Sequence, residues 1–281
     1  MRTIQSSLLT QAVAELFIEC SYVIGDDVRA AIDEAKASEP SPIGRNTLEQ
    51  ISENYRIAGA ERIAICQDTG LSVIFAQVGQ DAHIEGLPFE EAIQQGVREA
   101  YLQGYLRKSI VSDPVFDRVN TKDNTPAVIH TRIVPGDRVT LTAVAKGFGS
   151  ENMSALKMLV PADGVQGIKQ FVLDTVEKAG PNPCPPIIIG MGIGGSFESA
   201  AIMAKQATAL PLSRSNPDPR YKALEDGLLR AVNALGIGPG GTGGVTTALK
   251  VHILQAPTHI AGLPVAINIC CHAARHASVT L

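Results

Sequence analysis

The sequence contains no tryptophan, and aromatic residues make up only 4% of its 281 residues. A core without large aromatic side chains must be aliphatic, and hydrophobic residues are numerous enough, at 45%, to build one. No apolar run reaches the eighteen or so residues of a membrane helix, so we expect no membrane span. Residues 1–7 lack the apolar core of a signal peptide and the composition of a transit peptide, which predicts a cytoplasmic protein.

An excess of basic residues is also missing, because the formal net charge is −4 and the isoelectric point is near 5.9. A surface that binds nucleic-acid phosphates needs such an excess, so we expect no nucleic-acid partner. The charged fraction of 19% is typical of a folded chain and not of a disordered one. With 281 residues, the chain can form one large domain or two smaller ones.

Helical periodicity dominates the first sixty residues and then alternates with β-branched runs. Apolar residues from Leu8 to Cys20 recur at steps of three and four, and two further helical patterns precede residue 60. The later pattern predicts an α/β or mixed α+β body over residues 61–281. The expected strands are 72–78, 127–134, 138–146, 187–189, 248–254 and 263–270, and the expected later helices are 88–106, 163–178, 196–207 and 219–235.

The five cysteines do not form a recognisable disulfide framework. Their number is odd, their spacings are wide, and the chain shows no export signal. The five are Cys20, Cys66, Cys184, Cys270 and Cys271. Closely spaced Cys-x-x-Cys pairs, which zinc sites usually use, do not occur. Cys20 lies on the apolar face of a predicted helix and is interpreted as a core residue.

Three of the cysteines stand in settings that suit a ligand better than a core residue. Cys66 ends an apolar run just before a turn, and Cys184 lies between two prolines, which makes it a rigid mount in a loop. At 270–271, adjacent strand residues point to opposite faces, so only one of the two thiols can be the ligand. We expect three thiolates to meet around one iron–sulfur cluster. A cluster with three thiolates leaves one iron open as a Lewis acid, which favours hydro-lyase chemistry over electron transfer.

The segment from Gly190 to Gly195 offers an alternative, because it matches the dinucleotide-binding fingerprint Gly-x-Gly-x-x-Gly. No later strand ends in an acidic residue at the expected distance, so a nicotinamide-dependent oxidoreductase is the weaker interpretation. A strand, a glycine-rich loop and a helix in this order favour an anion site that receives a substrate carboxylate or supports the cluster.

Single polar residues around these motifs are candidates for acid–base and binding roles. Asp68 follows Cys66 by two residues and could act as a general acid or base, although an aspartate in a turn often only caps it. His259 precedes the strand that leads to Cys271. Arg107, at a predicted helix end, could hold a carboxylate or simply complement the helix dipole.

Several long motifs, in order, resemble one family. From about residue 51 to the C-terminus, the sequence is similar to the α subunit of class I, iron–sulfur fumarate hydratase and to the related tartrate dehydratase α subunits. The motifs that carry the resemblance are Cys-Gln-Asp-Thr-Gly at 66–70, Gly-Phe-Gly-Ser-Glu-Asn at 147–152, Asn-Pro-Cys-Pro-Pro at 182–186, Gly-Met-Gly-Ile-Gly-Gly at 190–195, Leu-Pro-Val-Ala-Ile-Asn at 263–268 and Cys-His-Ala at 271–273.

This resemblance implies a cofactor, a reaction and a set of site residues. It implies a [4Fe-4S] cluster held by Cys66, Cys184 and Cys271, and reversible hydration of fumarate to L-malate. L(+)-tartrate dehydration stays open, although the run at 272–275 is more similar to the fumarase version. The implied substrate contacts are Gln67, Asp68, the backbone of Gly149, Arg107 and His259, with Asp68 and His259 as the catalytic candidates.

The resemblance also implies a partner. Single-chain members continue into a second domain with further site groups, whereas this chain ends ten residues after Cys271. Residues 1–281 are therefore expected to be one α subunit, with a helical part at 1–60 and a cluster-binding body at 61–281, that works with a separate β subunit in an α2β2 assembly. A non-catalytic iron–sulfur subunit is the remaining alternative.

Overall fold

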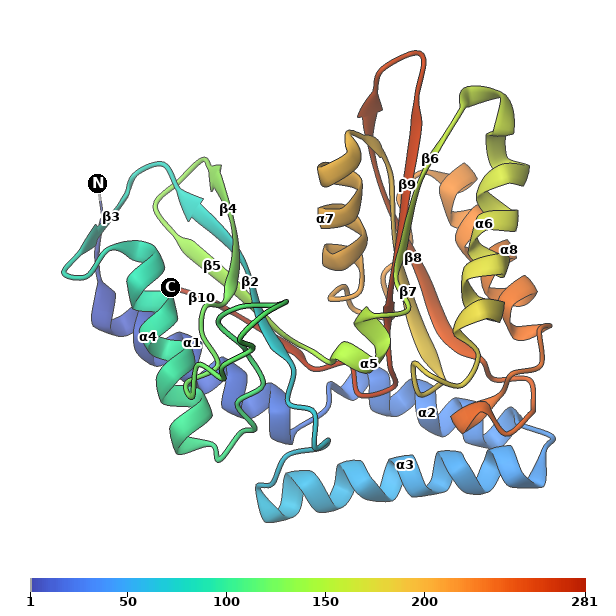
Figure 1. Ribbon diagram of the computed structural model, residues 1–281, viewed down its shortest axis with the longest axis horizontal. Coiled ribbons are helices and arrows are strands. Elements are labelled where there is room, and N and C mark those ends of the chain that lie inside the picture. Colours follow the sequence, from blue (N-terminus) through green and yellow to red (C-terminus); the bar gives the residue numbers. More distant parts are fainter. Residues whose placement is uncertain (1) are drawn as a thin grey trace. The chain divides into compact units, whose positions relative to one another are not determined.

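The computed structural model describes residues 2–281 and divides them into two compact units that are interleaved in sequence (Figure 1). The first unit comprises the residues up to Gly25, Tyr55–Phe148 and Arg275–Leu281, and the second comprises Asp26–Asn54 and Gly149–Ala274. Residues 1–60, expected to form one helical part, are therefore shared between the two units. The mixed helices and strands confirm the expected α/β class.

The first unit is built on a four-stranded sheet in the order β10-β5-β2-β4. Strand β2 pairs in parallel with β4 and antiparallel with β5, so the two strands joined by the Pro-Gly turn at 135–136 are separated by β2. Its elements are β1 (Arg2–Gln5), α1 (Ser6–Tyr22), β2 (Leu71–Gly79), β3 (Ala82–Glu85), α4 (Phe89–Gln103), β4 (Val128–Val134), β5 (Val139–Lys146) and β10 (His276–Thr280).

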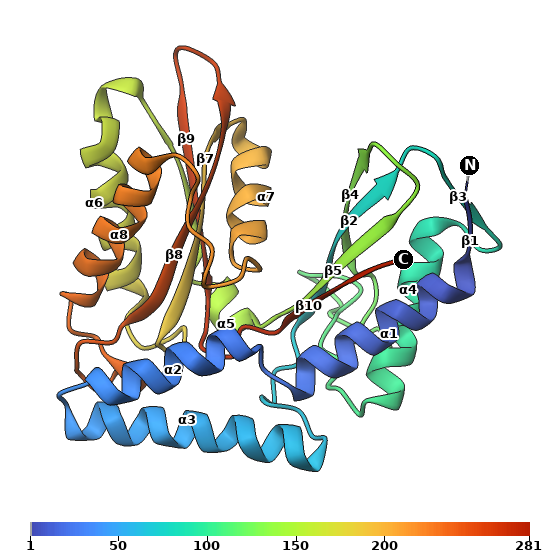
Figure 2. The same cartoon turned by 180° about the vertical axis from the view of Figure 1, so that it is seen from behind.

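Helices α1 and α4 pack closely against each other and cover one face of this sheet (Figures 1 and 2). A Cβ atom on Gly96 of α4 would lie 2.6 Å from the carbonyl oxygen of Thr10, so only glycine permits this helix spacing. Phe17 and Tyr101 fill the interface, with ring centroids 6.4 Å apart. Alternate residues of β5 complete the core, as the period of a half-buried strand requires.

The stretch Ser6–Ser38 is long enough to resemble a membrane span and contains an apolar window of 18 residues with a mean hydropathy of 1.3. It consists of two helices, α1 and α2 (Asp26–Ser38), and 61% of the apolar window is buried inside the protein. The core helix of a folded domain has the same composition, so this stretch is weak support for a membrane span.

The second unit is a four-stranded sheet in the order β6-β9-β7-β8, with α7 on one face and α6 and α8 on the other (Figures 1 and 2). Strand β7 pairs in parallel with β8 and antiparallel with β9. The elements are α5 (Phe148–Glu151), β6 (Ala155–Leu159), α6 (Gly164–Ala179), β7 (Ile187–Gly195), α7 (Phe197–Ala207), α8 (Pro219–Asn233), β8 (Ala248–Thr258) and β9 (Leu263–Cys270), with α2 and most of α3 (Pro42–Glu61) also in this unit and two short 3₁₀ turns at Pro161–Asp163 and Pro239–Gly241.

The glycine motif at 190–195 is part of strand β7 and does not form the expected anion-binding loop. A Cβ atom on Gly190 would lie 2.2 Å from the carbonyl oxygen of Ala204, and one on Gly192 would lie 2.0 Å from that of Ala200. Both acceptor residues belong to α7, so the glycines let this helix pack directly on the strand backbone. The loop prediction was wrong because the motif serves close packing.

Candidate active site

Cys184 and Cys271, 87 positions apart in sequence, lie side by side in the second unit. The backbone N–H of His272 donates to the carbonyl oxygen of Cys184 over 3.4 Å. Cys184 has a φ of 54°, in the left-handed region, and stands between two prolines, whereas Cys271 directly follows β9. The Cys184 side chain is exposed and that of Cys271 is partly so. We call these two residues the cysteine pair.

Gly149 belongs to the same end of the second unit. A Cβ atom on Gly149 would lie 3.8 Å from the carbonyl oxygen of Asn182, which is two residues before Cys184. Gly149 is exposed, so its backbone can be approached by a ligand. The second unit thus brings together three residues that the sequence analysis selected.

The first unit brings together a different group around residues 66–70, which we call the Asp68 turn. One carboxylate oxygen of Asp68 accepts from the N–H of Gly70 at 3.0 Å, and the other accepts from the N–H of Phe148 at 2.8 Å. The backbone oxygen of Asp68 accepts from Nη1 of Arg275 at 2.5 Å. These contacts orient the carboxylate and leave lone pairs on both oxygens.

The next residue in the Asp68 turn connects it to Arg107. The hydroxyl of Thr69 donates to the backbone oxygen of Arg107 at 2.9 Å, and the Arg107 side chain is exposed. The hydroxyl of Tyr101 donates to the carbonyl oxygens of Thr69 and Gly70, at 2.8 and 3.0 Å. Burial raises the pKa of Tyr101 to about 12, so this hydroxyl stays a donor throughout the neutral range.

Two buried basic residues next to the Asp68 turn were not selected from the sequence. Lys146 is fully buried and its Nζ donates to the carbonyl oxygen of Gly147 at 3.3 Å. Arg275 is 2% exposed, and its Nε has no hydrogen-bond partner within residues 2–281. Only the burial of these two residues identifies them, because a lysine that ends a strand and an arginine near the C-terminus are usually exposed.

His259 is not near the cysteine pair within the second unit. It follows β8 at the tip of the β8–β9 hairpin, where its Nδ1 accepts from the N–H of Ala261 at 3.2 Å. The eight residues of β9 separate this tip from Cys271, a distance of roughly 25 Å along an extended strand. Figure 1 shows the hairpin at the end of the sheet away from α2.

The other two cysteines are buried. Cys20 is 2% exposed, and burial raises the pKa of its thiol to about 12, so it lies in the core as predicted. Cys270 is 6% exposed within β9, whereas its neighbour Cys271 is accessible. Burial therefore distinguishes the two adjacent thiols in favour of Cys271 as a ligand.

The three candidate ligands have the chemistry that an iron–sulfur cluster requires. Cys66, Cys184 and Cys271 are all accessible thiols in turns or at a strand end, and none of them is in a disulfide. The cysteine pair supplies two of them and the Asp68 turn supplies one. Among residues 2–281, neither unit by itself gathers three His, Cys, Asp or Glu side chains that could hold a metal ion. The chemistry of these thiols thus fits the group.

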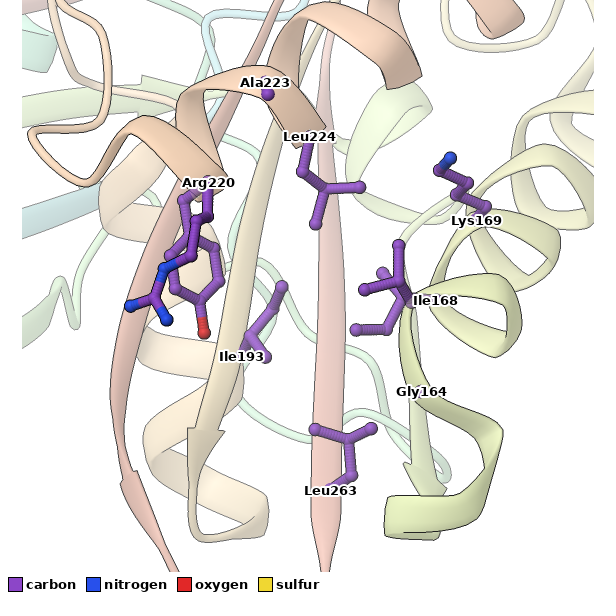
Figure 3. A pocket seen from close by; sticks show the side chains of 10 residues that line it. Gly164, Ile168, Lys169, Ile193, Arg220, Ala223, Leu224 and Leu263 are labelled. Atoms are coloured by element: carbon purple, nitrogen blue, oxygen red, sulfur yellow. The ribbon is translucent and has the colours of Figure 1, made fainter.

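A separate cavity of about 530 Å³ lies between α6 and α8 in the second unit (Figure 3). Its walls are mostly aliphatic, with Ile168, Ile193, Leu224 and Leu263 pointing into it. None of the site residues predicted from the sequence lines this cavity. It therefore does not belong to the candidate active site.

Comparison with known proteins agrees with these observations. Residues 10–280 match the model of the fumarate hydratase (fumerase) family. A relative from Methanocaldococcus jannaschii, provisionally named L(+)-tartrate dehydratase subunit alpha, is 41% identical over 273 residues, which cover 96% of both chains. The L(+)-tartrate dehydratase subunit alpha of Escherichia coli O157:H7 is 31% identical over 275 residues, which cover 96% of this chain and 90% of the relative. The chain belongs to the fumarate hydratase family and is a hydro-lyase of that family.

Proposed function

We propose that this chain is the α subunit of a hydro-lyase that interconverts L-malate and fumarate, with a [4Fe-4S] cluster held by Cys66, Cys184 and Cys271. The observation that carries the proposal is the pairing of Cys184 and Cys271 through the His272 N–H, next to Gly149. A core would have no use for an exposed cysteine fixed between prolines in a left-handed conformation, whereas a ligand needs this rigidity.

The reaction needs no oxidant or reductant. In the direction from L-malate, the C–O bond of the hydroxyl and one C–H bond of the neighbouring carbon break, a C=C bond forms, and the hydroxide and the proton leave as water. When bound, the cluster supplies an iron with an open position, which acts as a Lewis acid toward the hydroxyl and a carboxylate.

The residues of the chain would orient the substrate and move the proton. Asp68 is a candidate for the proton transfer, directly or through a group of the β subunit, because two backbone N–H groups hold its carboxylate in one orientation. Gln67 and Arg107 are exposed beside it and can donate to a carboxylate, and Gly149 can offer its N–H. Binding a dicarboxylate at two ends fixes which carbon loses the proton.

L(+)-tartrate is the second candidate substrate, because both relatives described above are named for it. Tartrate carries one hydroxyl more than malate, and its dehydration follows the same pattern of broken bonds. A site that hydrogen-bonds the second hydroxyl would reject malate strongly, whereas a site built for malate would discriminate less. The ratio of kcat/KM for the two substrates therefore decides between them.

His259 remains a predicted catalytic residue with an unusual position. Because His259 lies at the opposite end of β9 from Cys271, it would not contact a substrate that is bound beside the Cys271 of its own unit. His259→Ala in the assembled enzyme tests this role, and an unchanged kcat/KM would remove His259 from the site.

The β subunit is proposed because the relatives are named as alpha subunits, and an α2β2 assembly is the expected form. The decisive experiment is anaerobic co-expression of this chain with its β subunit, reconstitution with iron and sulfide, and EPR with and without malate or tartrate. We expect a spectrum that responds to the dicarboxylate. Asp68→Asn should keep the cluster and lower kcat by about 100-fold or more. A complex without any cluster would contradict the proposal.

A further inference from the structure

A partly buried ion pair connects two elements of the second unit near Gly149. Nζ of Lys205, on α7, donates to Oε1 of Glu151, which is the last residue of α5. The side chains are only 16% and 21% exposed, unlike those of a surface pair. Glu151 follows Gly149 by two residues, which is about 3 Å along a helix.

The same carboxylate also reaches the strand that leads to the cysteine pair. Oε2 of Glu151 accepts from Nδ2 of Asn268 at 2.9 Å, and Asn268 lies on β9, three residues before Cys271. The hydroxyl of Ser154 accepts from the same amide group and from the N–H of Ile269, both at 3.1 Å. Asn268 is 4% exposed, so these contacts are protected from water.

A network of this kind is better suited to fixing geometry than to adding stability. Burying two charges costs desolvation energy that their attraction often only balances, so an apolar pair would serve stability as well. Helix α5 has four residues, too few to hold a single turn without external contacts. Its position therefore depends on outside contacts, and the Glu151 contacts to α7 and β9 are among them.

We propose that Glu151, Lys205 and Asn268 are positioning residues that hold the Gly149 backbone in register with Cys271. This inference rests on the proposed function, because Gly149 matters to catalysis only if it contacts the substrate. None of the three side chains is assigned contact with substrate or cluster. Their effect passes through the segment 149–154 on one side and through the end of β9 on the other.

The first test needs no cofactor. Hydrogen–deuterium exchange on the full chain compares the wild type with Glu151→Gln and Lys205→Met, which keep the side-chain volume and remove the charge. Exchange should rise together in peptides covering 149–155 and 266–272. The control is Lys222→Met, which breaks a pair to Asp226 in the same unit whose side chains are 50% and 42% exposed, and it should change neither peptide. Faster exchange in only one of the two peptides would overturn the coupling.

The second test uses the assembled enzyme with its β subunit. Each network variant should keep the iron and sulfide content of the wild type and lose roughly 10- to 100-fold in kcat/KM, with most of the loss in KM. A kcat/KM within twofold of the wild type, together with a lower Tm, would mean that the network is only structural. If the wild-type complex has no hydro-lyase activity, the proposed function fails, and the exchange result still decides whether the network couples the two segments.

Discussion

The two units hold their candidate site residues in different ways. In the first unit, side chains hold the Asp68 turn, through the hydroxyl of Tyr101, the guanidinium of Arg275 and the carboxylate of Asp68 itself. In the second unit, backbone geometry holds the cysteine pair, through flanking prolines, the left-handed Cys184 and a backbone hydrogen bond. The difference lies in how the groups are held: side-chain contacts hold Asp68 and its neighbours in the first unit, whereas backbone geometry holds two of the three candidate ligands in the second.

The largest effect should come from removing a ligand of the cysteine pair. Cys184→Ser should abolish the cluster, measured as iron and sulfide content and visible absorption. Activity should fall by more than about 100-fold, which is more than the loss of a residue that only orients a ligand would cause. Cys270→Ser is the matched control, because Cys270 is the buried neighbour of Cys271. A cluster that survives Cys184→Ser but not Cys270→Ser would reverse the assignment of the ligands.

Thiol labelling should distinguish the accessible cysteines from the buried ones without any mutation. With the pKa of Cys20 raised to about 12, only about one thiol in 10,000 is ionised at pH 8, so alkylation of Cys20 should be undetectable on the time scale of exposed thiols. Cys184, which is exposed, should be modified first in the cluster-free chain. Peptide mass spectrometry after short incubation with iodoacetamide measures both rates. Modification of Cys20 before Cys184 would contradict the burial.

Sequence patterns predicted most of the fold because its longer elements are strongly periodic. The helix expected from Ser7 is α1, and those expected at 163–178 and 196–207 are α6 and α7, with ends displaced by one or two residues. The short elements β1, β3, β6 and β10 were not predicted. Strands β1 and β3 have only four residues each. They pair with each other, and β6 pairs with β9, so the partners are remote in sequence. Local patterns carry little information about such pairings.

The candidate site was predicted less completely, for a different reason. Residue type and setting were enough to select Cys184 and Asp68, since a cysteine between two prolines suits a ligand better than a core residue and Asp68 follows the candidate ligand Cys66 by two residues. The buried Lys146 and Arg275 and the partly buried Glu151 could not be found in this way, because burial of a charged residue depends on tertiary packing that no local pattern records. The glycines of β7 show the opposite error, in which a motif with a known chemical use serves packing.

The buried carboxylate of Glu39 tests whether side chains, as well as backbone geometry, stabilise the second unit. Glu39 is 2% exposed and accepts from the N–H groups of Ser41, Val245 and Thr246 at 2.9 to 3.1 Å. Burial alone would raise the pKa of Glu39, but these hydrogen bonds outweigh it and lower the pKa below its ordinary value of 4.5. Glu39→Gln should cost about 2 kcal/mol at neutral pH, because an amide group would face a backbone N–H.

The pH dependence of this effect has a definite sign. The folded state holds Glu39 ionised to a lower pH than the unfolded state does, so its contribution is complete above pH 4.5 and is lost as the pH falls through the lower folded pKa. In urea denaturation, the wild type and Glu39→Gln should therefore differ most at pH 7 and converge in acid. A difference that does not depend on pH would mean that the charge of Glu39 contributes nothing.

The smallest effect, and the sharpest test of the comparison, concerns one hydroxyl of the first unit. Tyr101→Phe removes the donor to the carbonyl oxygens of Thr69 and Gly70, and Gly70 keeps a second donor in Nδ2 of Asn124 at 3.2 Å. The expected loss is about 1 kcal/mol, or a Tm lower by roughly 2–4 °C. Tyr22→Phe is the matched control, because Tyr22 is buried in the same unit and donates to the carbonyl oxygen of Gly104 at 2.6 Å.

The two variants should be equal in stability and different in catalysis. Both remove one buried hydroxyl donor, but only Tyr101 contacts the Asp68 turn, so only Tyr101→Phe should raise KM in the assembled enzyme. Cluster content should stay unchanged in both, because the Tyr101 hydroxyl bonds Thr69 and Gly70 and the Tyr22 hydroxyl bonds Gly104, and none of these is a proposed ligand. An equal KM for the two variants would show that the Tyr101 hydroxyl does not orient the Asp68 turn for substrate binding. The side-chain contacts of the first unit would then contribute to stability alone.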